Sequence, residues 1–334
     1  MLIVPPSTSS PCQLEPILWR GLEAYLLDNG LVRAIVVPAL GGKIASLVDL
    51  KTGREWLWQN PHLEAKPAEF GASYVARHDL GGFDECFPSV SATRYPTGPW
   101  EGTPIPDHGE IWPLQWKADT FCDGATSELR LTAHGVRFPY RFERTMRMAE
   151  GEAALRLSYT VTNFAPFPFP FLWSAHPILA VEPGMKLVVP LRDMTVYASA
   201  DDRFGRLGTP QVFPRLVDRD GRGHDVSTLP EPAAGFAVKL FGKSPIQGFV
   251  AVQDPDRQRE LRMQFDPEEV THVGLWLNFG GWSGVPGAPG YYNLGLEPCI
   301  GAQDDLAIAH QQYKETGVLP PMGRKTWQLD LIMR

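Results

Sequence analysis

Proline and glycine interrupt this chain too often for long helices, since each occurs 32 times in 334 residues. Proline lacks the backbone N–H and glycine weakens helical order, so this density favours short strands joined by turns. We expect strands to hold more than about 40% of the residues and helices less than about 10%, far from the usual mixture. The best helix candidate runs from Asp304 to Tyr313, where Asp304 or Asp305 could cap the first turn.

Polar and apolar residues alternate along much of the chain, which is the pattern of a strand with one buried and one solvated face. Three alternating runs lie between residues 128 and 162, separated by turn-like residues at Gly135 and at Glu150–Glu152. Further strand-like runs continue towards the C-terminus, and we find no repeat and no linker. The pattern predicts an all-β protein of one domain, built from two large packed antiparallel sheets.

Charge and cysteine usage narrow the classes of partner and compartment. The net charge is −7 and the basic residues form no cluster, so we expect no nucleic-acid binding. The four cysteines are scattered and form no CxxC motif, which is typical of a reduced, intracellular protein. Residues 1–13 lack the features of a signal peptide, and no run of about 18 apolar residues occurs. We therefore expect a cytoplasmic protein that does not bind membranes.

One loop-like segment combines charges with residues that favour burial. The segment from Arg77 to Pro88 holds an arginine, a histidine and three carboxylates around the pair Gly81–Gly82. A surface loop would explain the charges alone. The interleaved Phe83, Cys86 and Phe87 suggest instead that part of the segment is buried, where charges need partners.

Three further segments each hold one residue able to carry a proton. His108 lies in a loop-like segment, whereas His176 and Glu297 each end a strongly apolar run and are each followed by a proline. Since proline removes a ladder hydrogen bond, we expect both strands to end there. A carboxylate among apolar neighbours is costly to bury in its charged form, which suits a general base. Taken singly, each residue also fits a structural role, as a half-buried histidine or an exposed glutamate.

The familiar nucleotide, nucleophile and zinc motifs are missing from the sequence. It contains no GxSxG, no P-loop, no GxGxxG after a strand and no HExxH. His108 and Glu110 with a distant histidine could imitate a metal site, but no second close ligand pair follows them. We expect neither a metal nor a cofactor.

Together, these segments resemble the aldose 1-epimerase (galactose mutarotase-like) family, and a divergent branch of it that includes sugar-phosphate epimerase-like members. Each motif is short, so the specificity lies in the set and in its order along the chain. The resemblance covers roughly residues 15–333 and is carried by Gly81–Gly82 to Pro88, His108–Gly109, Ala175–His176–Pro177 with Gly184, and Leu296–Glu297–Pro298.

The resemblance implies a β-supersandwich in a single domain spanning residues 1–334, with a shallow sugar-binding cleft. By resemblance, Glu297 matches the general base, His176 the general acid, and His108 a histidine that contacts the sugar. The family also uses an arginine on the early loop, and Leu80 stands where it is expected. Arg77 is the best substitute.

Three further residues complete the candidate binding set. Asp84 lies in the charged segment described above, and Trp276 and Trp282 could stack on the apolar face of a sugar, although a packing role explains each equally well. The family's substrate-binding aspartate has no counterpart that the sequence identifies. Only Arg77 and Arg94 lie near the site segments, so we expect a neutral or weakly charged sugar and not a sugar phosphate.

The implied reaction is the interconversion of α and β anomers of an aldose, by acid–base opening and closing of the ring. The expected partner is a small sugar, bound by a monomer or a homodimer. One alternative is a carbohydrate-binding protein of the same fold without turnover. Another is a carbohydrate lyase or hydrolase, and hydrolysis would need Glu297 paired with Asp84 or Glu85.

Overall fold

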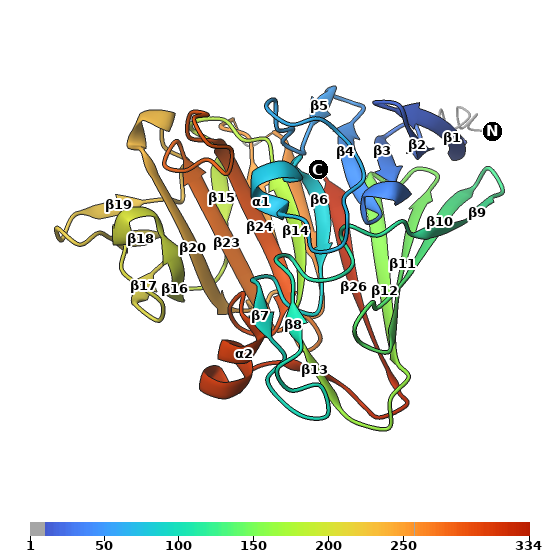
Figure 1. Cartoon of the computed structure of the whole chain (residues 1–334). Helices are drawn as coiled ribbons and strands as arrows, with labels where there is room; N and C mark the ends of the chain where they lie inside the picture. The colour runs from blue at the N-terminus through green and yellow to red at the C-terminus, as the bar shows by residue number, and fades with distance from the viewer. Residues whose placement is uncertain (1–10, 257) are drawn as a thin grey trace.

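The computed structural model describes residues 11–256 and 258–334, and strands dominate it (Figure 1). Strands hold 49% of the residues and helices 7%, and the strands are nearly all antiparallel. These values confirm the all-β prediction and the expected pair of large sheets.

The larger sheet has fourteen strands in the described residues. Its strands follow in the order β1 (Gln13–Trp19), β2 (Leu22–Asp28), β3 (Val32–Val37), β4 (Lys43–Asp49), β6 (Gly82–Cys86), β14 (Trp173–Leu179), β24 (Tyr292–Ile300), β23 (His272–Phe279), β20 (Phe236–Lys243), β16 (Asp193–Ser199), β17 (Pro210–Val212), β18 (Arg215–Val217) and β19 (Gly223–Asp225), with β5 (Arg54–Glu55) paired to β4. The two edge strands of this sheet, β1 and β19, lie on opposite sides of the molecule (Figure 1).

The second sheet has eight strands among the described residues. Their order is β15 (Lys186–Val188), β21 (Phe249–Gln253), β22 (Glu260–Gln264), β26 (Arg324–Met333), β12 (Ala154–Asn163), β11 (Tyr140–Ala149), β10 (Thr126–His134) and β9 (Lys117–Cys122). Two small pairs complete the strands: β13 (Phe169–Phe171) with β25 (Gly317–Leu319), and β7 (Thr93–Arg94) with β8 (Pro104–Ile105).

Helical structure is limited to short turns. α1 covers Tyr74–Arg77, and α2 covers Leu306–Ile308 and continues as one π-helical turn over Ala309–Tyr313. The side chain of Asp305 caps α2 by accepting from the backbone N–H groups of residues 307 and 308 at 2.8 and 3.1 Å. The predicted helix is therefore confirmed, with Asp305 as its cap. Three further 3₁₀ turns cover residues 38–40, 200–202 and 232–234. No helix in the described part of the chain is long and apolar enough to cross a membrane.

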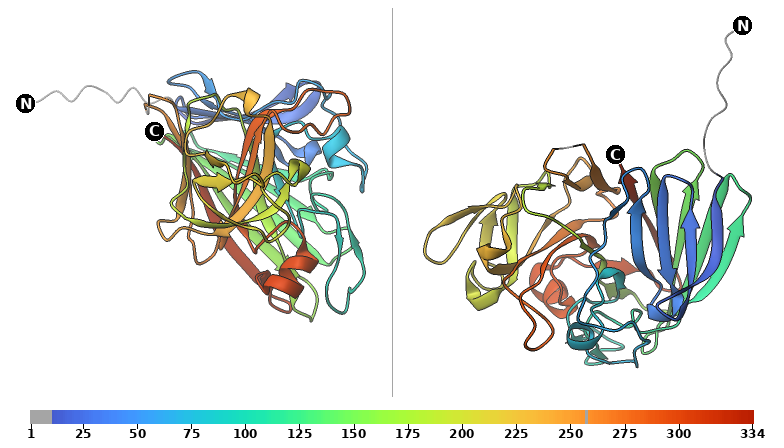
Figure 2. Two further views of the ribbon diagram at one scale, coloured as in Figure 1. Left: turned by 90° about the vertical axis from the view of Figure 1, so that its left-hand side faces the viewer. Right: turned by 90° about the horizontal axis from the view of Figure 1, so that it is seen from above.

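The two large sheets pack their apolar faces together, and Figure 2 shows their strands in two layers at one end of the molecule. Tyr159 of β12 and Trp327 of β26 both contact Trp173 of the larger sheet, with ring centroids 4.9 and 5.0 Å apart. The alternation between residues 128 and 162 predicted this arrangement, since Leu129 and Leu131 are fully buried while Arg130 between them is exposed. The face of the larger sheet that points away from the second sheet takes no part in this packing, and it can carry polar residues.

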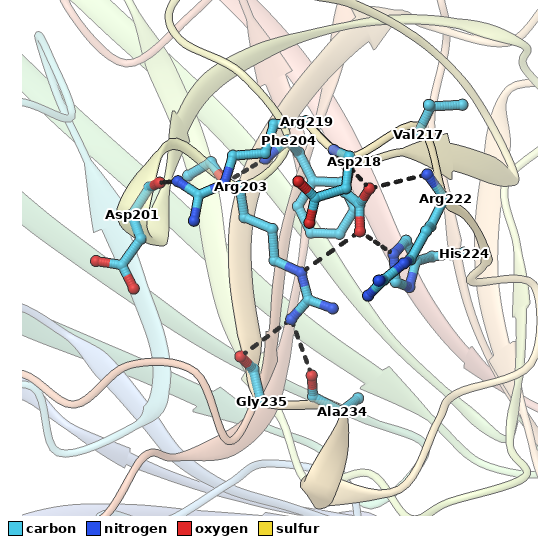
Figure 3. A network of polar contacts seen from close by, with 12 residues as sticks. Asp201, Arg203, Phe204, Val217, Asp218, Arg219, Arg222, His224, Ala234 and Gly235 are labelled. Atoms are coloured by element: carbon cyan, nitrogen blue, oxygen red, sulfur yellow. Dashed lines mark hydrogen bonds and ion pairs between the residues drawn. The ribbon is translucent and has the colours of Figure 1, made fainter.

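The outer strands β17–β19 are held together around Asp218 (Figure 3). Its carboxylate accepts from His224 Nε2 at 2.8 Å and from the backbone N–H of Arg222 at 2.9 Å, and Arg203 Nε lies 4.0 Å away. The hydrogen bond from His224 and those from the backbone lower the pKa of Asp218 to about 2. A carboxylate with this many donors has a structural role.

Candidate active site

Three neighbouring strands in the middle of the larger sheet bring predicted site residues together (Figure 1). β6, β14 and β24 contribute Asp84, His176 and Glu297, and the register pairs His176 with Asp84 on one side. On the other side, the register of the flanking pairs sets His176 opposite Glu297. We call these three residues the central row. They lie on the face away from the second sheet, because the residue before each one belongs to the apolar core: Phe83, Ala175 and Leu296.

Both strands continue through the prolines that were expected to end them, so the prediction of strand ends at His176 and Glu297 is wrong. Pro177 and Pro298 instead interrupt only the ladder between β14 and β24, which pairs again on either side of them. Neither proline can donate a ladder hydrogen bond. The interruption therefore lies where His176 faces Glu297, with the strands themselves intact.

Glu297 is fully buried, and its two carboxylate oxygens have different surroundings. Oε2 pairs with the Lys239 ammonium and accepts a hydrogen bond from Ser174 Oγ at 3.2 Å. Oε1 has no hydrogen-bond partner among the described residues and lies 4.0 Å from His176 Nε2. Gly295 keeps the space beside Oε1 open, because a Cβ there would lie 2.6 Å from that oxygen. One oxygen is thus occupied and the other is available.

Asp84 repeats this pattern on the other side of His176. Its Oδ2 pairs with the Lys43 ammonium and accepts from the Tyr74 hydroxyl at 2.6 Å. Its Oδ1 is buried without a hydrogen-bond partner within residues 11–256 and 258–334. Lys43 also donates to the Gly81 carbonyl oxygen at 2.7 Å, which fixes its position. Two buried carboxylates, each with one open oxygen, therefore flank His176.

The two site histidines are in contact, and their surroundings shift their pKa values in opposite directions. The ring centroids of His176 and His108 lie 5.1 Å apart, and Tyr74 stacks on His108 at 3.8 Å. Burial, together with the positive charges of His108 and of two lysines, lowers the pKa of His176 well below its ordinary value. Burial also opposes protonation of His108, but the carboxylate of Asp107, whose Oδ1 lies 3.1 Å from His108 Nδ1, raises the pKa of His108. The site therefore favours protonation of His108 over that of His176.

A tight turn holds His108 against the end of β6. His108 has a φ of 60°, a conformation that L-residues other than glycine seldom adopt. Gly109 follows with a φ of 81°, and a Cβ at this position would lie 2.1 Å from the Phe87 carbonyl oxygen. Only glycine fits so close an approach. The turn at His108–Gly109 thus places the His108 imidazole beside the central row.

Asp304 adds a third carboxylate beside the central row. Its Oδ1 lies 3.7 Å from Lys239 Nζ, and its backbone carbonyl accepts from the N–H groups of residues 90 and 91 at 2.9 and 2.8 Å. The preceding residue, Gln303, has a φ of 70°. Burial raises the pKa of Asp304 to about 6, with the charge of Glu297 adding to the rise and Lys239 opposing it.

Aromatic residues border the row on the Glu297 side. Trp276 of β23 is half-buried and pairs with Gly295 in the β23–β24 register, so it lies next to Glu297 on the same face. Its ring lies 5.5 Å from that of Trp282, and Trp282 lies 6.1 Å from Tyr291. Both predicted tryptophans therefore stand together beside the row.

The side chains of the row are little exposed, whereas the resemblance implies a shallow sugar-binding cleft. The side chains of His176, His108 and Asp304 are 10–12% exposed, while Glu297 is not exposed at all. A small cavity borders Asp84 and is lined in part by Lys43, His78 and Trp112. A much larger hollow of about 900 Å³ lies along β1, β2 and β9, away from every residue of the row.

The cations at the row are two lysines that the sequence patterns did not identify. Arg77, the predicted cation, is exposed at the end of α1, whereas Lys43 and Lys239 contact the carboxylates. Lys239 lies between apolar residues inside strand β20, and a lysine in the middle of such an apolar run is a usable signal of a buried ion pair. Lys43 and Asp304 carry no comparable local signal, because their partners are distant in sequence.

One group of side chains could approach a metal ion. Cys86, His108 and His176 each offer a ligand atom, and these atoms lie within 4.8 Å of one another. Ligands of one zinc ion lie roughly 3.3–3.8 Å apart, given metal–ligand bonds of about 2.0–2.3 Å, so the set would have to contract. Glu110 is excluded from such a site, because its carboxylate accepts from the backbone N–H groups of residues 136 and 137 and from Tyr140.

Comparisons with known proteins give a family from one family model and a shared fold from solved structures. A family model described as aldose 1-epimerase matches residues 23–271, a range that includes Asp84, His108 and His176 and ends before Glu297. No curated protein matches the chain.

Several solved structures share the fold at low sequence identity. A galactose mutarotase-like protein from Clostridium acetobutylicum has a TM-score of 0.67 at 12% identity, covering 98% of this chain and 99% of that one. The Slr1438 protein from Synechocystis sp. PCC 6803 has a TM-score of 0.64 at 17% identity, covering 93% and 95%. A galactose mutarotase-like protein from Lactobacillus casei has a TM-score of 0.57 at 16% identity, covering 93% and 100%.

Proposed function

The chain belongs to the aldose 1-epimerase family, and from this premise we propose that it interconverts the α and β anomers of an aldose. Glu297 is the proposed base and His176 the proposed acid. The observation that carries the proposal is the pair itself: a buried carboxylate with one open oxygen lies opposite an imidazole at 4.0 Å. A reacting sugar that lies over the pair, with its C1 hydroxyl towards Oε1 and its ring oxygen towards Nε2, would contact both groups.

In the proposed reaction, Oε1 of Glu297 takes the proton of the C1 hydroxyl while His176 protonates the ring oxygen. The ring opens, the C1–C2 bond rotates, and closure on the other face returns both protons. The lowered pKa of His176 makes its protonated form a strong acid that is scarce at neutral pH. His108, whose pKa Asp107 raises against the effect of burial, lies beside His176 and can contact the sugar.

The charges at the row favour an uncharged sugar. Lys43 and Lys239 are each paired with a carboxylate, so neither ammonium is free to bind a phosphate group. The open atoms, Oδ1 of Asp84 and Oε1 of Glu297, are acceptors that suit hydroxyl donors. Trp276 offers an apolar ring next to Glu297. We therefore propose a neutral aldose as substrate, bound by Asp84, His108 and Trp276.

The test is an anomer-exchange assay by polarimetry or NMR over a panel of free and phosphorylated aldoses. The Glu297→Gln variant keeps the shape and removes the base, and should lower kcat by about 100-fold, or roughly 3 kcal/mol in ΔΔG‡, while sugar binding changes little. His176→Asn should behave similarly.

A matched control is Glu315→Gln, because Glu315 also pairs with a β20 lysine and a histidine, Lys243 at 2.7 Å and His272 at 3.0 Å, outside the central row. Near wild-type exchange by folded Glu297→Gln would remove the mechanism. A wild-type protein that binds sugars without exceeding the spontaneous rate would instead be a carbohydrate-binding protein. Much faster turnover of a hexose 6-phosphate would overturn the assignment of a neutral substrate.

A further inference from the structure

Lys239 is a buried charged residue that has no role in the proposed proton transfers. The residue is 4% exposed and lies in β20, whose neighbouring positions Val238 and Leu240 belong to the apolar core. Its side chain crosses β23 at Gly274, where an added Cβ would lie 3.4 Å from Lys239 Cε, and reaches Glu297 on the next strand. A lysine placed this deeply needs compensating carboxylates, and it has two.

We propose that Lys239 is the positioning residue of Glu297, holding Oε2 so that Oε1 alone acts as the base. The inference rests on the proposed function. Lys239 and Ser174 together occupy Oε2. Rotation of the carboxylate would exchange its oxygens only by breaking both contacts, so the basic oxygen stays on the side of His176. Gly295 leaves the space that this oxygen needs.

Asp304 completes the arrangement by sharing the ammonium. It lies 3.7 Å from Lys239 Nζ, and its backbone is fixed by the two hydrogen bonds from residues 90 and 91. When Glu297 takes up the substrate proton it becomes neutral, and Asp304 then remains as the counter-charge of Lys239. The base can therefore change its charge during each turnover without leaving a buried ammonium unpaired.

The charged neighbours of Lys239 agree with this assignment. Burial opposes its protonation, but Asp304 and Glu297 raise the pKa of Lys239, so the ammonium persists at neutral pH. Cys299 on β24 also acts on it, and burial raises the pKa of that thiol well above its ordinary value. The charge of Lys239 in turn acts on His176, Cys86 and Tyr197. The positive charge beside Glu297 is therefore permanent under assay conditions.

The experiment compares Lys239→Met with Lys243→Met, each in the wild type and in the Glu297→Gln background. Lys243 is a close control, since it lies on the same strand and pairs with Glu315, outside the central row. Lys239→Met should lower kcat by about 10-fold or more and change KM by less than about threefold. In the Glu297→Gln background the same change should cost nothing further.

Circular dichroism and thermal unfolding establish that each variant is folded. If Lys239→Met does not fold, Ser174→Ala removes the other partner of Oε2 and should lower kcat in the same direction by a smaller factor. Equal kcat in Lys239→Met and Lys243→Met, or an equal loss with and without the Glu297 carboxylate, overturns the inference alone. A wild-type protein without exchange activity overturns both this inference and the proposed function.

Discussion

Asp84 and Glu85 are neighbours on β6, and each is a buried carboxylate paired with a cation, yet their surroundings differ in one decisive respect. Glu85 faces the core between the sheets, where its Oε1 binds Arg144 at 2.7 Å and Tyr159 at 2.9 Å, and its Oε2 accepts from Trp173 at 2.7 Å. Both of its oxygens are occupied. Asp84 faces the other side and keeps Oδ1 open.

Burial and ion pairing therefore do not distinguish a structural carboxylate from one suited to bind a ligand. Burial raises the pKa of Glu85 against the pull of Arg144, which shows how strongly the core environment acts on it. What separates the two faces is the number of unused acceptor atoms. Asp218 in the outer strands resembles Glu85 in this respect, since several donors surround it (Figure 3). The open oxygens of Asp84 and Glu297 mark the face that awaits a hydroxyl donor.

The largest effect should come from Glu85→Gln. Removing one partner of a buried ion pair leaves Arg144 without a counter-charge, and the free energy of unfolding should fall by about 3–5 kcal/mol. Turnover per folded molecule should be unchanged. Urea unfolding followed by circular dichroism measures the first quantity and an active-fraction assay the second. Unchanged stability together with lost turnover would show that the inward face takes part in the chemistry.

A smaller effect is expected for Asp84→Asn. The substitution keeps the shape and removes the charge that accepts a substrate hydroxyl, so sugar binding per folded molecule should weaken by about 10-fold. It also removes the counter-charge of the buried Lys43, so a loss of stability accompanies it. The value of kcat should change much less than in Glu297→Gln. Titration calorimetry with a bound aldose measures the difference. A variant with unaltered affinity and a large loss of kcat would mean that Asp84 acts in the proton transfers.

A spectroscopic effect should follow from His108→Asn. The positive charge of His108 is one of the causes that, after burial, lower the pKa of His176, so its removal should raise the pKa of His176. NMR titration of the imidazole resonances measures this value. The control is His224→Gln, which changes a histidine paired with Asp218 and should leave His176 unaffected. A fall in the pKa of His176 would contradict the proposed distribution of charge.

The smallest effect is expected from a chelator. The proposed proton transfers use only side chains, so EDTA should leave anomer exchange unchanged. Activity that EDTA abolishes and a divalent ion restores would assign Cys86, His108 and His176 as ligands, since their donor atoms lie within 4.8 Å of one another.

Local patterns sufficed to predict the fold, because alternation and turn residues act over a few positions. They also indicated His176 and Glu297 as candidates, whereas the roles of acid and base came from the family resemblance and stay predictions. They failed where the answer depends on pairing between distant strands. The prolines predict strand ends, whereas in the structure both strands continue and only the ladder between β14 and β24 is interrupted. Lys43 and Lys239 pair with carboxylates that lie 41 and 58 residues away in the sequence. No local pattern contains such a relation.

The interrupted ladder has a consequence for how this chain can vary over evolutionary time. Pro177 and Pro298 lie far apart in sequence, yet both contribute to the same interruption between β14 and β24. Restoring an N–H at either position alone would allow one new ladder bond and draw the strands together on one side of the His176–Glu297 row. Selection would then act on the two prolines as a linked pair. Among relatives that keep the histidine and the glutamate, the two positions should be inherited or lost together.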